Sequence, residues 1–144
     1  MIGRLAVIVG HTPKAKGALA VSPLALHEFD YNEKIAQLLV EDCRLQYIEM
    51  KVFRHLTKRE ETYQAVNDWV QKEGCAIELH FNAEASGKAR GTETLYIATG
   101  VNEEFAKILQ GTVVLCFERT AVQNRRAKPL SEKDRGHYNL SLLK

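Results

Sequence analysis

The stretch CAIELHFNA, residues 75–83, predicts a short apolar strand that ends in a histidine and an asparagine. Side chains alternate between the two faces of a strand, so Glu78, His80 and Asn82 should share one face. Open α/β sheets place their chemistry at the carboxyl ends of the strands. We therefore expect His80 to face a functional site if other segments bring partners to the same edge of the sheet.

A second apolar run ends in the same way near the start of the chain. Residues 5–9, LAVIV, predict a buried strand that passes into a turn at Gly10 and His11. Residues 14–26 combine glycine and Ser-Pro punctuation with no sustained periodicity, which is typical of a loop over a sheet edge. His11 is therefore a second histidine at the end of a predicted strand.

The segments between these strands alternate between helical and extended patterns. Apolar residues at helical spacing predict a helix from Glu28 to Cys43, and residues 46–53 alternate as a strand. Thr57 opens a capping box, which predicts a second helix with Gly74 as its C-cap. This order predicts an α/β fold with one open, mostly parallel sheet flanked by helices.

The second half of the chain is less regular. Residues 92–98 predict a strand because β-branched and aromatic residues are frequent there. Residues 102–118 fit one face of a helix, although residues 112–117 also fit a strand, and we favour the helix. The charged residues 119–136 predict a solvated loop, and residues 138–143 predict a further apolar strand.

The composition indicates one soluble domain, residues 1–144. The chain is 45% hydrophobic and 26% charged, and no apolar run approaches the roughly 20 residues of a membrane helix. The net charge of +2 disfavours a nucleic-acid surface, although Arg125, Arg126 and Lys128 form a basic run. Three dispersed cysteines and a first strand unlike a signal peptide predict synthesis in the cytoplasm without a secretion signal.

His11, Glu28 and His80 are the groups that this fold could bring together. Two imidazoles and one carboxylate are the ligand set of hydrolytic zinc sites, in which water takes the fourth position. Ligands from three separate elements follow no fixed spacing, so the residues alone leave a metal site and unconnected structural histidines as alternatives. The remaining histidines match no ligand position, and we expect ordinary surface or turn positions for them: His27, His55 and His137.

Five segments carry a family resemblance, in this order along the chain: VGHTP (9–13), KGA (16–18), Glu28 with Asn32, LHFNA (79–83) and GTETLY (91–96). Together they resemble the zinc-dependent N-acetylmuramoyl-L-alanine amidases of the Amidase_3 type, particularly the phage and prophage forms. The most specific part is H-x-N-A followed by G-T-E-x-x-Y, with GH and a glutamate upstream.

The resemblance implies a phosphorylase/hydrolase-like sheet and one zinc ion bound by His11, Glu28 and His80. It implies peptidoglycan as the substrate, cut at the amide between the lactyl group of N-acetylmuramic acid and L-alanine. Asn82 should orient a substrate group or cap the strand end. We accordingly expect a lytic, endolysin-like or prophage enzyme that acts on the bacterial cell wall.

The catalytic base is the part of the family pattern that this sequence does not show. The resemblance places a glutamate on a later strand, so we expect it beyond Lys144, with the domain lacking its C-terminal strand. Glu93 and Glu78 are the alternative candidates, and Glu93 better suits holding a ligand histidine in the right tautomer. The alternative function is a catalytically silent wall-binding or phage-structural module that retains an amidase-like metal site.

Overall fold

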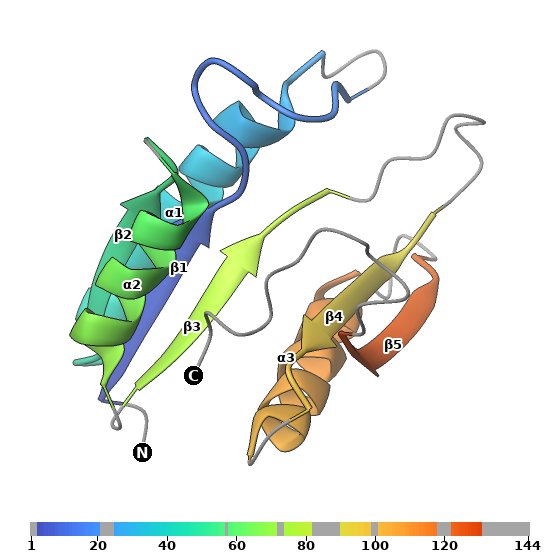
Figure 1. The fold of residues 1–144 in the computed structure, drawn as a ribbon. Helices are drawn as coiled ribbons and strands as arrows, with labels where there is room; N and C mark the ends of the chain where they lie inside the picture. Colours follow the sequence, from blue (N-terminus) through green and yellow to red (C-terminus); the bar gives the residue numbers. More distant parts are fainter. Residues whose placement is uncertain are drawn as a thin grey trace. The chain divides into compact units, whose positions relative to one another are not determined.

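The computed structural model describes residues 3–20, 25–56, 58–71, 74–81, 90–98, 101–117 and 122–130. The chain divides into two compact units, residues 1–81 and residues 82–143. Each unit contains a parallel sheet with helical cover, which confirms the predicted α/β class (Figure 1). Within the described ranges, no helix combines the length and apolar character needed to cross a membrane.

The first unit is built on a three-stranded parallel sheet with the strand order β2-β1-β3. The strands are β1 (Arg4–Val9), β2 (Glu49–Arg54) and β3 (Gly74–Leu79), and they are connected through α1 (Glu28–Leu45) and α2 (Arg59–Val70). β1 is central, and its last four residues are fully buried. A strand covered on both faces needs apolar side chains on both, which explains the unbroken LAVIV run.

The two helices of this unit cover opposite faces of the sheet, as Figure 1 shows. Val7 and Val9 of β1 pack against Phe29 and other residues of α1. Phe53 of β2 is paired in register with Ile8, which alternation places on the other face, and its ring contacts Trp69 of α2 with centroids 6.0 Å apart. The carboxyl ends of the strands therefore lie between the two helices.

The boundaries of α2 differ from the prediction. Its N-cap is Lys58, whose side chain makes no capping hydrogen bond, while Thr57 lies outside the described residues. Its C-cap is Gln71 with φ +53, so the prediction that Gly74 caps this helix is wrong. Gly74 instead begins β3, where a Cβ atom would lie 2.5 Å from the carbonyl oxygen of Arg4. The glycine is needed for close approach of the paired strands.

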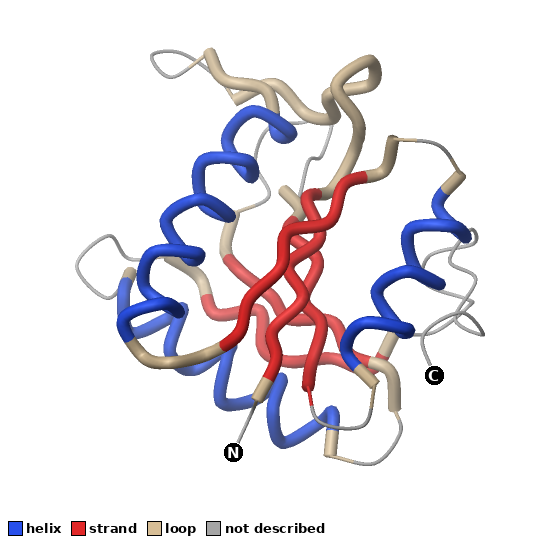
Figure 2. The backbone as a smooth tube through the Cα atoms, turned by 90° about the vertical axis from the view of Figure 1, so that its left-hand side faces the viewer, coloured by secondary structure: helices blue, strands red, loops and turns tan. Residues whose placement is uncertain are grey.

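The second unit contains β4 (Thr92–Tyr96), α3 (Asn102–Cys116) and β5 (Asn124–Pro129), and Figure 2 shows its helix and strands in a second view. α3 confirms the helix favoured for residues 102–118. The prediction of a loop over residues 119–136 is wrong for β5, which pairs in parallel with β4. The predicted strand at residues 138–143 lies outside the described part of the chain.

The basic residues of β5 pair with a buried acid of β4. The side chain of Glu93 in β4 is only 4% exposed, and its Oε2 lies 3.3 Å from Arg125 Nη2 and 2.8 Å from Lys128 Nζ. A buried carboxylate is tolerated when it is paired. The basic run is therefore partly neutralised within the sheet.

Candidate metal centre

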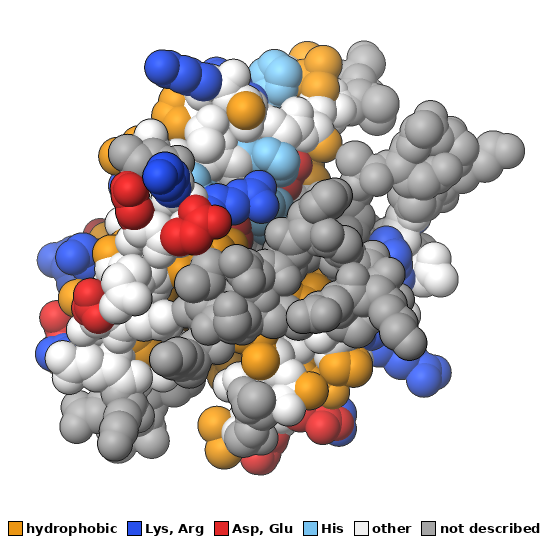
Figure 3. All heavy atoms as spheres, in the orientation of Figure 1, with side chains coloured by type: hydrophobic (Ala, Val, Ile, Leu, Met, Phe, Trp, Pro, Cys, Tyr) orange, Lys and Arg blue, Asp and Glu red, His pale blue; other side chains and the backbone are white. Residues whose placement is uncertain are grey.

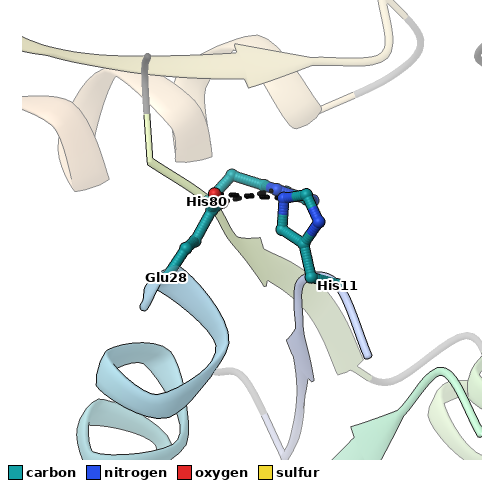
Figure 4. A group of neighbouring side chains, drawn as sticks. All are labelled: His11, Glu28 and His80. Atoms are coloured by element: carbon teal, nitrogen blue, oxygen red, sulfur yellow. Dashed lines mark hydrogen bonds and ion pairs between the residues drawn. The ribbon is translucent and has the colours of Figure 1, made fainter. Parts of the chain in front are cut away.

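Three elements deliver polar side chains to the carboxyl end of the first sheet. His11 follows β1, Glu28 is the first residue of α1, and His80 follows β3. Figure 4 shows the three side chains pointing toward one another. Each offers a ligand atom, and these atoms all lie within 4.8 Å of one another. The structure thus brings together the three residues that the sequence singled out.

Glu28 is the centre of this cluster. Its side chain is 2% exposed, and its Oε1 lies 3.0 Å from His80 Nδ1 while its Oε2 lies 3.0 Å from His11 Nε2. The backbone N–H of Phe81 donates to Oε1 at 2.6 Å, and that of Ala18 donates to Oε2 at 3.1 Å. The amino terminus of α1 also favours a negative charge at this position. The carboxylate is therefore fixed in place from two loops.

Two glycines leave the space that the cluster occupies. At Gly17, with φ +75, a Cβ atom would lie 2.5 Å from His11 Cδ2 and 2.6 Å from Glu28 Oε2. At Gly10, a Cβ atom would lie 2.6 Å from His80 Cε1. His11 itself has φ +68, a left-handed conformation that costs a residue with a side chain about 1–2 kcal/mol. The backbone around the cluster is therefore shaped to aim these side chains.

His80 faces a carboxylate with each ring nitrogen. Nδ1 lies 3.0 Å from Glu28 Oε1, and Nε2 lies 3.0 Å from Glu78 Oε1. Burial alone would lower the pKa of His80, but hydrogen bonds and charge from Glu78 and Glu28 raise it above its usual value. A neutral imidazole carries one N–H, so the second nitrogen needs a proton or another cation against its carboxylate. Asn32 steadies the segment by donating to the carbonyl of Leu79 at 2.9 Å.

Comparison with known proteins identifies the family of the chain. The sequence matches Amidase_3, N-acetylmuramoyl-L-alanine amidase, over residues 5–142. The chain belongs to this family. Membership supports peptidoglycan amidase activity, and the family is generally metal-dependent. The chain matches no curated protein.

Solved structures show the same fold. The chain is similar to AmiC2, an N-acetylmuramoyl-L-alanine amidase of Nostoc punctiforme, with TM-score 0.73 and 16% identity over 88% of this chain and 68% of that one. An N-acetylmuramoyl-L-alanine amidase from Clostridium difficile 630 gives TM-score 0.69 and 22% identity over 97% and 72%. Cwp6 from Clostridium difficile gives TM-score 0.78 and 21% identity over 97% of this chain but 22% of its own.

A further carboxylate links the amidase-family cluster to the protein interior. Glu78 Oε1 contacts His80 and also lies 3.0 Å from His55 Nε2, and the Tyr63 hydroxyl donates to Oε2 at 2.9 Å. Burial alone would raise the pKa of Glu78, but the hydrogen bonds from His55 and His80 hold it well below its usual range. The predicted shared face of Glu78 and His80 is confirmed by their contact. Among the described contacts, the carboxylate beside Nε2 of His80 is that of Glu78.

The prediction for His55 is wrong. We expected an ordinary surface or turn histidine, but its side chain is 1% exposed and pairs with Glu78. The signal was its position directly after β2, a third strand-end histidine in this amidase-family unit. His27 is the N-cap of α1 and is partly buried, with an Nδ1 atom that has no partner within the described residues. His137 and the predicted substrate residue Asn82 lie outside the described residues.

Proposed function

We propose that the chain is a zinc-dependent N-acetylmuramoyl-L-alanine amidase that cuts the amide between the lactyl group of N-acetylmuramic acid and L-alanine in peptidoglycan. The observation that carries the proposal is the compact cluster of His11, Glu28 and His80 in a chain of this family. Two imidazoles and one carboxylate are a known ligand set of hydrolytic zinc sites, which keep a fourth position open.

The residues of the cluster fit one zinc ion. His11 Nε2, the carboxylate of Glu28 and His80 Nδ1 are the atoms that face one another. The contact between His80 Nδ1 and a carboxylate suits a cation at this point. A zinc ion in such a site activates water near neutral pH and polarises the carbonyl of the amide.

The exposure of the cluster fits a polymeric substrate. Glu28 is 2% exposed, whereas the side chains of His11 and His80 are 29% and 30% exposed. Figure 3 shows histidine side chains at the surface, beside acidic and basic groups. The buried carboxylate of Glu28 and the two partly exposed imidazoles would hold a metal where a glycan strand with its peptide could reach it from solvent.

The general base and the lytic role belong to the same proposal. Glu93 and Glu78 are the candidates for the base within the given sequence. Glu78 is engaged by His55, Tyr63 and His80, an arrangement better suited to holding a side chain than to transferring protons. The family match favours the enzyme over a silent wall-binding module. The endolysin-like role rests on the resemblance to phage and prophage forms.

Metal analysis of purified protein tests the ligand assignment. The unaltered chain should contain about one zinc ion, and His11→Ala, Glu28→Gln and His80→Ala should each contain less than about a tenth of that. Glu41→Gln is the matched control, since Glu41 lies on the same helix as Glu28 but its side chain is 59% exposed. Stoichiometric zinc in all three site variants would overturn the assignment.

Digestion of purified peptidoglycan tests the reaction. The protein should release peptides with new L-alanine amino termini and produce no new reducing sugar ends. A chelator should stop the release, and added zinc should restore it. New reducing ends without new alanine amino termini would indicate a glycosidase instead. Falling turbidity of intact cells on addition of the protein would support the lytic role, and unchanged turbidity with active digestion of purified wall would contradict it.

A further inference from the structure

A chain of polar contacts runs from the interior of the first unit to His80. His55, which follows β2, lies 3.0 Å from Glu78 of β3, and Tyr63 of α2 donates to the same carboxylate at 2.9 Å. The rings of His55 and Tyr63 also meet edge to face, with centroids 5.5 Å apart. Glu78 then contacts His80 Nε2 at 3.0 Å. Three separate elements thus converge on one carboxylate beside the cluster.

The location of Glu78 is unusual for an acidic residue. It is paired in register with Ile8, which is 2% exposed, on the sheet face that carries α2. An acid at such a position costs free energy unless hydrogen bonds compensate it. The side chain of Glu78 is 20% exposed, and an apolar residue could pack beside Ile8 without that cost. Because an acid is less favourable here than an apolar residue, we infer that the carboxylate serves the site rather than the packing.

We propose that Glu78 is a positioning residue that, with His55 and Tyr63, holds the His80 imidazole so that its Nδ1 atom faces Glu28. A histidine that binds a metal through one nitrogen commonly donates its other N–H to a carboxylate, which fixes the tautomer and the ring orientation. Glu78 provides that acceptor at Nε2, on the opposite side of the ring from Glu28. The inference rests on the proposed metal site.

The neighbours of Glu78 satisfy both oxygens of its carboxylate. Both of its oxygens accept hydrogen bonds: Oε1 is shared by the two histidines, and Oε2 is taken by Tyr63. A carboxylate accepts, so His55 donates its Nε2–H to Glu78, and within the described residues its buried Nδ1 atom has no partner. Besides His80, the carboxylate is therefore held by His55 and Tyr63.

Glu78→Gln is the direct test because it keeps the shape of the side chain. An amide has one acceptor oxygen and one NH₂ group, so it cannot accept from all three donors. Competition with a chelator of known affinity should show zinc binding weakened by about 10- to 100-fold. Nitrogen-15 spectra of the histidine rings should change as well. In the metal-free protein with a neutral ring, loss of the Glu78 charge should shift the His80 proton from Nε2 toward Nδ1, which faces Glu28.

Tyr63→Phe is the second variant, and Glu41→Gln is the control. Tyr63→Phe removes one donor to Glu78 but keeps the ring that packs on His55, so it should fold and shift the His80 ring signals with a smaller loss of zinc affinity, about two- to fivefold. Glu41→Gln should change neither readout. The proposal is overturned if both network variants leave the His80 tautomer and the zinc affinity as in the unaltered chain. If the unaltered chain binds no zinc, the proposed function fails, while the metal-free tautomer measurement still decides the role of Glu78.

Discussion

Gly17→Ala tests whether the loop after β1 is shaped around the cluster. At φ +75 an alanine costs about 1 kcal/mol more than glycine, and its methyl group would lie 2.5 Å from His11 Cδ2 and 2.6 Å from Glu28 Oε2. Carbon atoms pack at about 3.5 Å, so one of these groups must move by about 1 Å. The side chain of Glu28 cannot move without loss, because it is buried and accepts hydrogen bonds from the backbone of Ala18 and Phe81.

A displacement of this size exceeds the tolerance of a metal site, in which ligand distances hold to about 0.2 Å. We expect zinc affinity to fall by at least about 100-fold, which corresponds to about 2.7 kcal/mol. The metal-free protein should also lose about 2–4 kcal/mol of unfolding free energy, from overpacking and backbone strain together. Chelator competition measures the first quantity, and urea denaturation with a chelator present measures the second.

Gly111→Ala is the matched control. Gly111 lies within α3, and a Cβ atom there meets nothing within 4 Å. This substitution should stabilise the protein by about 0.5–1 kcal/mol and leave zinc affinity unchanged. If Gly17→Ala binds zinc as tightly as the unaltered chain and is no less stable, the loop after β1 is not shaped around the cluster.

Three further predictions concern stability and reactivity. Zinc at 100 times its Kd should stabilise the chain by about 2.7 kcal/mol, seen as a higher melting temperature that a chelator reverses; an unchanged melting temperature would contradict a folded-state site. Lys58→Ser gives α2 a capping side chain that it lacks and should add about 0.5–1 kcal/mol in urea denaturation, whereas a loss would argue against the N-cap position. Burial raises the pKa of Cys75 to about 11, so about one thiol in a thousand is ionised at pH 8. Exposed Cys116 should therefore react with iodoacetamide first, and Cys75 should become reactive only as the pH approaches 11; equal rates at pH 8 would refute this.

Several features of this fold could be predicted because neighbouring residues determine them. The LAVIV run gave β1, and helical spacing gave α1 with Glu28 at its first residue. The choice of a helix for α3 also held. These features depend on hydrophobic periodicity and on turn residues, which operate over a few positions along the chain.

Other features depended on contacts that the local pattern does not contain. β5 pairs with β4, a strand remote in sequence, and Glu93 of β4 offsets the charge of Arg125 and Lys128. Gly74 is required by the neighbouring strand rather than by a helix end. Charge alone predicted a loop at residues 119–136, and a glycine alone predicted a helix cap at Gly74. Both predictions were wrong because pairing between distant strands overrides local propensity.

The sequence by itself predicted the parallel α/β alternation, His11 and His80 at strand ends and Glu28 at a helix start, because these positions follow from where apolar runs stop and helical spacing begins. The family resemblance then singled out these three residues as ligands. Only the tertiary structure decided which carboxylate contacts Nε2 of His80. It is the carboxylate of Glu78, which also contacts His55 and Tyr63. These residues come from three elements with no fixed spacing. The distances between their side chains depend on how α2 packs on the sheet. Hydrophobic periodicity along the chain does not contain this information.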